Sequence, residues 1–119
     1  MRYVTVVNVT TGETLARHAA VAETLWTRFL GLQGRRSLPS SEGLVLLPTS
    51  SIHMFFMFMR IDAVFVGSDG HVVRVGRRLR PWTVGPIARG ALYCVELPEG
   101  AAERTQDGHT IELRAEPPA

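Results

Sequence analysis

The sequence predicts an α+β fold that is mostly β: a small mixed sheet or partly closed β-barrel of short strands, with one helix packed against it. Short apolar runs recur along the chain and are separated by turns that contain glycine or proline. One segment alone has apolar residues at helical spacing. The 119 residues are 45% hydrophobic and 20% charged, which suffices for one core. We therefore expect a single domain over residues 1–119, with a frayed tail from about residue 115.

The N-terminal third is expected to hold a hairpin followed by the helix. Residues 3–9 alternate apolar and polar side chains, and residues 14–20 supply the returning strand after a glycine turn. Leu25, Phe29 and Leu32 then fall on one helical face. This is the one helix that the sequence predicts.

The middle of the chain is the most apolar part. Residues 43–47 read as a short aliphatic strand. The stretch from Ser51 to Phe58 is apolar on both alternating faces, which predicts a strand covered on both sides. Residues 61–66 form a further strand, and the sequence Ser-Asp-Gly at residues 68–70 indicates a hairpin into the valine-rich run that follows.

The last third has two more expected strands. Residues 76–90 contain two prolines and several glycines, and we expect them to be irregular. Residues 91–98 predict a buried strand, residues 99–108 a turn or short helical turn, and residues 109–115 the closing strand.

Composition excludes some classes of function. Arginine supplies all 13 basic side chains, and the net charge of +2 is too small to indicate nucleic-acid binding by itself. Cys94 is the single cysteine, so an internal disulfide and a cysteine metal cluster are excluded. The N-terminus lacks a signal-peptide pattern, and residues 52–59 are too few to span a bilayer. We expect a cytoplasmic protein without a cofactor.

Several short motifs together resemble a known family. They are R-x-x-G-L-x-x-R from Arg28, EGLVL from Glu42, IHMFFM from Ile52, IDAVFV from Ile61, DGHVVRV from Asp69, LRPW from Leu79 and VELPEG from Val95. Their order is similar to that of DUF192, a bacterial and archaeal family of domains of unknown function, from about residue 19 to residue 113. The resemblance implies a compact β-rich domain with one helix and brings no known activity, substrate or cofactor. The chain departs from the family pattern at Gln33, where relatives often have methionine.

Two acidic side chains and a histidine lie in apolar surroundings. His53 and Asp62 belong to the most apolar stretch, and Glu96 lies in the buried strand near the C-terminus. A buried carboxylate needs a partner. Arg28 and Arg35 share a helix face, so we expect one of them to reach Asp62 or Glu96 and tie the helix to the sheet. The alternative is a metal-dependent or acid–base enzyme that uses His53, Asp62 and Glu96.

The favoured function is a non-catalytic binding or accessory domain that contacts a small ligand or a protein partner. The candidate surface consists of His53, Met57, Arg80, Pro81 and Trp82, because excess apolar residues lie near an exposed-looking Arg-Pro-Trp loop. No catalytic or metal-binding motif is recognised.

A weaker alternative is nucleic-acid binding. Arg74, Arg77, Arg78 and Arg80 precede one tryptophan, an arrangement that suits phosphates and a stacked base. A solvated strand whose arginine stems cover apolar surface explains the same run, and no nucleic-acid motif accompanies it.

Overall fold

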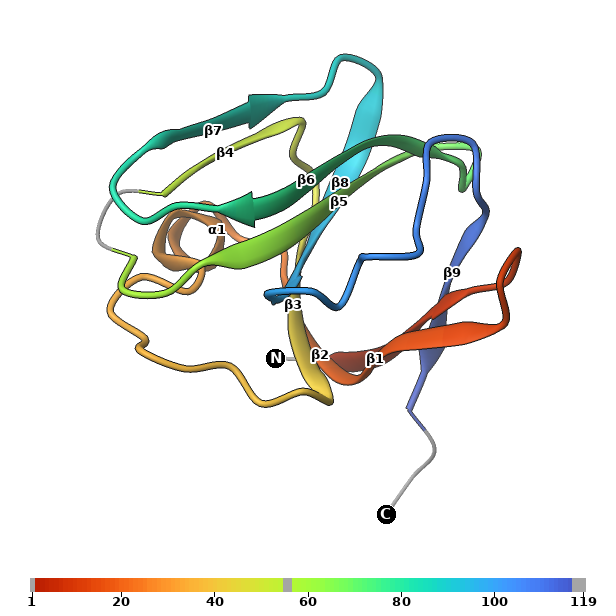
Figure 1. The fold of residues 1–119 in the computed structure, drawn as a ribbon, viewed down its shortest axis with the longest axis horizontal. Coiled ribbons are helices and arrows are strands. Elements are labelled where there is room, and N and C mark those ends of the chain that lie inside the picture. The colour runs from red at the N-terminus through yellow and green to blue at the C-terminus, as the bar shows by residue number, and fades with distance from the viewer. Residues whose placement is uncertain (1, 55–56, 117–119) are drawn as a thin grey trace.

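The computed structural model describes residues 2–54 and 57–116, apart from the side chains of residues 25 and 26 (Figure 1). This part of the chain holds nine strands and one helix. They are β1 (Tyr3–Asn8), β2 (Glu13–Ala22), α1 (Leu25–Leu30), β3 (Glu42–Leu46), β4 (Ser51–His53), β5 (Ile61–Gly67), β6 (Val72–Leu79), β7 (Val84–Ile87), β8 (Ala91–Pro98) and β9 (Ile111–Ala115). The predicted α+β class, mostly β with one helix, is confirmed.

Seven strands form one curled mixed sheet in the order β6-β5-β8-β3-β2-β1-β9. β2 and β3 run parallel, and the other neighbouring pairs run antiparallel. The two edges of the sheet meet at one end, where His71 pairs with Thr110 and the Val72 amide donates to the His109 carbonyl at 2.8 Å. The sheet is therefore a partly closed barrel. β4 and β7 form a separate antiparallel ribbon.

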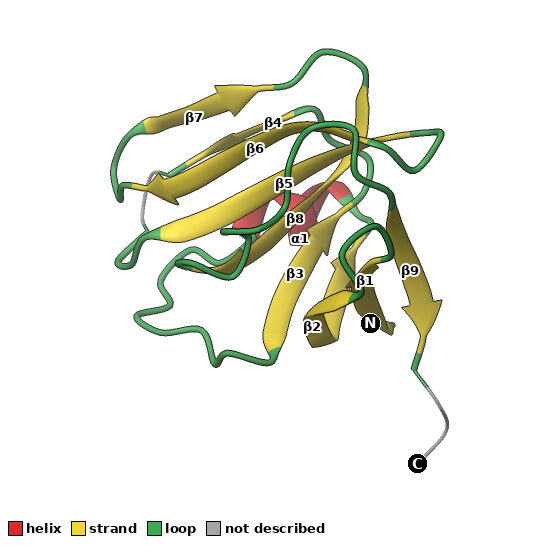
Figure 2. Cartoon of the chain, turned by 45° about the vertical axis from the view of Figure 1, so that its right-hand side comes forward, coloured by secondary structure: helices red, strands yellow, loops and turns green. Residues whose placement is uncertain are grey.

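The middle of the sheet is covered on both faces. All seven residues of β5 are buried. Because side chains alternate along a strand, Val64 and Val95 face the core inside the curled sheet, whereas Phe65 and Cys94 face a second core outside it. The segment after β4 contributes Met54 and other residues to this outer core. Figure 2 shows α1 against β8 on that side of the sheet.

The helix is only six residues long. Thr24 caps its N-terminus, since the Thr24 hydroxyl accepts from the Thr27 amide and the Thr27 hydroxyl accepts from the Thr24 amide. Gly31 ends it with a φ of 48°, a conformation that glycine adopts at little cost. In the sequence, apolar residues continue at helical spacing to Leu32, but the helix ends at Leu30. Leu32 is nevertheless buried.

Two predictions for the middle of the chain are wrong in part. The predicted strand from Ser51 to Phe58 ends at His53, because the Met54 amide and carbonyl bond to the Thr83 carbonyl and the Trp82 amide in the connection before β7. Phe58 is exposed rather than covered. Residues 55 and 56 lie outside the described residues.

The segment 76–90, expected to be irregular, contains the end of β6 and the whole of β7. Pairing with β4 organises this stretch, and Gly85 permits it, since a Cβ there would lie 2.4 Å from the Ile52 carbonyl oxygen.

The closing strand ends at the residue that the sequence predicts. β9 runs to Ala115, and a Glu116 carboxylate oxygen lies 2.7 Å from Nδ1 of His18. The rest of the expected frayed tail lies outside the described residues and stays a prediction.

Asp62 is the buried polar anchor of the inner core. Its carboxylate accepts the backbone amides of Arg78 at 3.0 Å, Gly100 at 3.1 Å and Ala102 at 2.9 Å. These bonds hold the end of β6 and the loop after β8 onto β5. For Asp62, the expected ion pair with a helix arginine does not form: in the described part of the chain, backbone amides and not arginines bind its carboxylate.

We expect Asp62→Asn to destabilise the fold by roughly 3 kcal/mol. The amide group that replaces one oxygen donates instead of accepting, so at least one backbone N–H loses its acceptor. Urea unfolding measures the change, and Asp107→Asn at an exposed aspartate serves as the control. Equal stabilities of the two variants would show that the three amide bonds contribute little.

Candidate functional site

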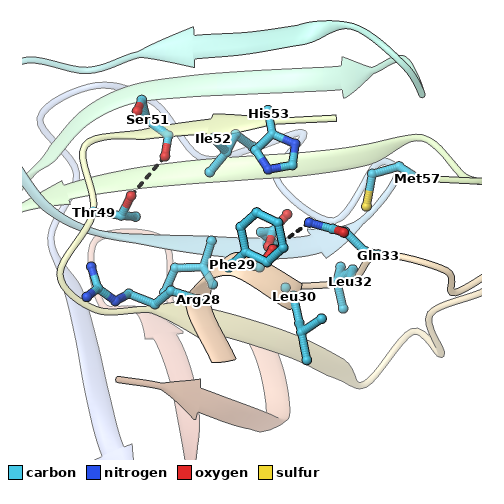
Figure 3. A pocket seen from close by; sticks show the side chains of 13 residues that line it. Arg28, Phe29, Leu30, Leu32, Gln33, Thr49, Ser51, Ile52, His53 and Met57 are labelled. Carbon is cyan, nitrogen blue, oxygen red and sulfur yellow. Dashed lines mark hydrogen bonds between the residues drawn. The ribbon is translucent and has the colours of Figure 1, made fainter. Parts of the chain in front are cut away.

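A cavity of about 650 Å³ lies between the α1 segment and the outer face of the sheet (Figure 3). The residues that line it come from three places: the helix and its C-terminal turn, the β3–β4 region, and β8. They are Arg28, Phe29, Leu30, Gly31, Leu32, Gln33, Leu46, Thr49, Ser51, Ile52, His53, Met57 and Glu96.

Apolar side chains form most of the wall. Leu32, Leu46 and Met57 are buried, and they belong to the outer core. Phe29 is 58% exposed, and its ring centroid lies 6.4 Å from that of His53. Figure 3 shows these two rings facing each other from α1 and β4.

The one buried acidic side chain among the lining residues is Glu96 on β8. It pairs in register with Ala63 of β5 and Leu44 of β3, so it points to the outer face together with apolar neighbours. The turn after α1 passes close to it, because a Cβ built on Gly31 would lie 3.4 Å from Oε1 of Glu96. The positive φ at position 31 favours glycine, whereas a Cβ there would make only an ordinary contact with the carboxyl group.

Burial raises the pKa of Glu96 to about 7, since removal from water disfavours the ionised form. Within the described residues no hydrogen bond or ion pair reaches its side chain, in contrast to the three bonds at Asp62. Burial, together with the charge of Glu96, also raises the pKa of the neighbouring Cys94 thiol. Cys94 is thus a buried, unreactive thiol.

Three hydrogen-bond donors that line the cavity bind backbone carbonyl groups. Arg28 donates to the carbonyl oxygens of Pro48 at 2.8 Å and Thr24 at 3.3 Å. The Gln33 side-chain amide donates to the Phe29 carbonyl, and the Thr49 hydroxyl donates to the Ser51 carbonyl at 2.8 Å. Figure 3 marks the last two bonds. The cavity therefore combines an acidic group, Glu96, to which no described residue donates, with three donors that bind the backbone.

The predicted ligand surface divides into two parts. His53 and Met57 line the cavity, whereas Arg80, Pro81 and Trp82 are not among its lining residues. Trp82 is 52% exposed and meets Phe58 edge to face at 6.0 Å. Arg28 and Glu96 of the predicted polar network line the cavity without bonding to each other, and Arg35 lines a smaller cavity beyond Gly31 and Leu32.

The three-residue site of the enzyme alternative does not form. Asp62 pairs with Leu97 while Glu96 pairs with Ala63, so the two carboxyl groups lie on opposite faces of the sheet. The described residues contain no cluster of three histidine, cysteine or acidic side chains that suits a metal ion.

The arginine run is largely engaged within the protein. Arg74 donates to the Ile87 carbonyl at 2.9 Å, and Arg77 donates to the carbonyls of two residues in the loop after β8. Arg78 pairs with Glu103 at 2.9 Å. These contacts favour the structural interpretation of the run over phosphate binding.

Sequence reasoning missed the convergence that makes the cavity. It assigned Glu96 to a salt-bridge network and did not single out Phe29, Gln33 or Thr49 as site residues. The available signal was a glutamate in a buried strand together with a glycine directly after the helix. Neither the glutamate nor the glycine indicates which segments of the chain the fold brings together.

A model of the DUF192 family, described as an uncharacterised ACR, matches residues 6–113. The chain belongs to the DUF192 family. A UPF0127 protein of Thermococcus sibiricus is 34% identical over 105 residues, and the match covers 82% of the chain and 65% of that relative. A UPF0127 protein of Pyrococcus furiosus is 35% identical over 101 residues, and the match covers 81% of the chain and 84% of that relative. The predicted family is confirmed.

Two solved structures are similar to this DUF192 fold. A protein of unknown function from Novosphingobium aromaticivorans has a TM-score of 0.79 and 28% identity, covering 92% of the chain and 83% of that protein. A Sinorhizobium meliloti protein, provisionally described as a transcription regulator, has a TM-score of 0.80 at 21% identity, covering 94% of the chain and 92% of that protein. The second likeness shows the fold alone. In the described part of this DUF192 chain, no helix is long and apolar enough to cross a membrane.

We expect Glu96 to make stability fall with pH between about 4.5 and 7. In that range the unfolded chain has an ionised Glu96 while the folded protein still holds the proton, so unfolding is favoured as pH rises, and the effect levels off above pH 7. Glu96→Gln removes this pH dependence. The free energy of unfolding of the variant therefore rises relative to that of the parent protein as pH increases from 4.5 to 7, by roughly 3 kcal/mol at most.

Urea unfolding of both proteins from pH 5 to pH 8 measures the difference. Glu99→Gln, at an exposed glutamate on the same chain segment, is the matched control and leaves the slope in place. A constant stability difference between the parent protein and Glu96→Gln over this range contradicts the raised pKa.

Proposed function

We propose that this domain is a non-catalytic binding module that takes a small, mostly apolar molecule into the cavity between α1 and β8. The observation that carries this proposal is the buried carboxyl group of Glu96, which lines an apolar cavity and is left without a partner in the described structure. A carboxyl group that opens on an apolar cavity offers a ligand an acceptor that no described side chain uses. The carboxylate of Asp62, by contrast, accepts three hydrogen bonds from backbone amides of the protein itself.

The dimensions of the cavity support a small ligand. Its volume of about 650 Å³ falls in the range of small-molecule sites, which are concave, mostly apolar and equipped with a few polar groups. A protein partner is less well supported, because the exposed Trp82 and the arginine run lie apart from this cavity. The free, buried Cys94 fits a role in the reducing cytoplasm.

A tryptophan at position 33 tests the proposed site. Figure 3 shows the Gln33 side chain on the cavity wall, pointing toward Phe29. We expect Gln33→Trp to lose most binding of small molecules, because the indole ring fills the space that a ligand needs. The measurement is ligand-observed NMR with a set of neutral, cationic and anionic fragments at millimolar concentration.

Gln106→Trp is the matched control, since Gln106 is exposed on the loop after β8 and does not line the cavity. It should bind the same fragments as the parent protein. A fragment set without a single binder, or binders that Gln33→Trp leaves unaffected, would refute the proposed function.

A further inference from the structure

We propose that the ligand carries a protonated amine, which pairs with the Glu96 carboxylate, on a compact apolar body that fills the rest of the cavity. This inference rests on the proposed binding function and specifies the chemistry of the ligand.

The first argument concerns donors and acceptors. Of the five lining side chains that carry N–H or O–H groups, three already donate to backbone carbonyl oxygens, namely Arg28, Gln33 and Thr49, and the other two are Ser51 and His53. Glu96 is an acceptor whenever it is ionised, and no group of the described protein donates to it. A ligand that brings its own donors therefore complements this cavity better than a ligand that brings acceptors.

The second argument concerns charge. The pKa of Glu96 is raised by burial, and the guanidinium of Arg28 does not offset this effect although it lines the same cavity. The Arg28 side chain is instead directed to Pro48 and Thr24. The protein thus buries a carboxyl group without supplying its counter-charge. An ammonium group supplies both the charge and several N–H donors, and such charge-assisted hydrogen bonds are stronger than neutral ones.

The third argument concerns the remaining surface of the cavity. Leu32, Leu46, Ile52 and Met57 provide apolar walls, and the exposed ring of Phe29 stands on the same side as His53. An apolar body attached to the amine gains from contact with these walls. A small hydrophilic cation such as ammonium itself leaves them uncovered.

Binding should then depend on pH. Near pH 6 the free protein holds a proton on Glu96, and pairing with an ammonium group releases it. The other titratable or charged groups near this carboxyl are Arg28 from α1 and His53 from β4, which line the same cavity, and Cys94 from β8 itself. β3 and β5 present Leu44 and Ala63 in register with Glu96, and neither side chain titrates.

Matched sets of amine, alcohol and carboxylate probes test the proposal. We suggest 2-phenylethylamine, 2-phenylethanol and phenylacetate, together with the equivalent cyclohexylmethyl and naphthylmethyl sets, titrated by calorimetry at pH 8. We expect the amine of a set to bind at least about tenfold more tightly than the alcohol. Glu96→Gln should remove this preference while the apolar walls still bind both members weakly.

The pH profile gives a second readout. Amine affinity should rise roughly thirtyfold between pH 5.5 and pH 8 as Glu96 loses its proton, because the amine stays protonated over that range. Alcohol affinity should change little. His53→Gln removes the imidazole from the cavity, and the midpoint of the amine profile should persist in this variant.

The outcomes separate the two proposals. Alcohols or carboxylates that bind in the cavity as tightly as the amines would overturn the amine inference and leave the proposed binding function standing. Amine binding that Glu96→Gln does not weaken would do the same. If no member of any set binds, the inference and the proposed function both fail.

Discussion

The central constraint on this structure is that β5 and β8 are covered on both faces. Any charged side chain on these strands must find its partner inside the protein or in something that the protein binds. Asp62 and Glu96 are neighbours in the β5–β8 ladder and point to opposite faces. On the inner face, three backbone amides stabilise Asp62. On the outer face, Glu96 meets a cavity instead. The same strand pair therefore anchors the barrel and presents the candidate site.

Much of the fold follows from the sequence because strand pattern and turn chemistry are local properties. The N-terminal hairpin and the hairpin at residues 68–70 were predictable for this reason. The strand expected from Ser51 to Phe58 was not, because hydrogen bonds between Met54 and the Trp82–Thr83 segment redirect the chain after His53. Such contacts join residues far apart in sequence, and an apolar run carries no sign of them.

The sequence predicted individual residues of the candidate site but not their arrangement. A glutamate in a buried strand requires an explanation on physical grounds, and the sequence supplied arginines at helical spacing as possible partners. The side chain of Arg28 instead binds two carbonyl oxygens. That choice depends on where the helix ends and how Pro48 is placed, which the fold determines. A sequence pattern identifies buried charge more readily than it identifies the group that compensates for it.

Because the cavity lies outside the curled sheet, the residues that form the inner core are largely different from those that line the cavity. The inner core draws on strands from both edges of the sheet, whereas the cavity wall comes largely from one short helix, its C-terminal turn and β4. Changes at positions such as 29, 32 and 33 can reshape the cavity while the barrel stays intact. The architecture therefore allows related chains to differ in the shape and lining of this cavity without rebuilding the scaffold.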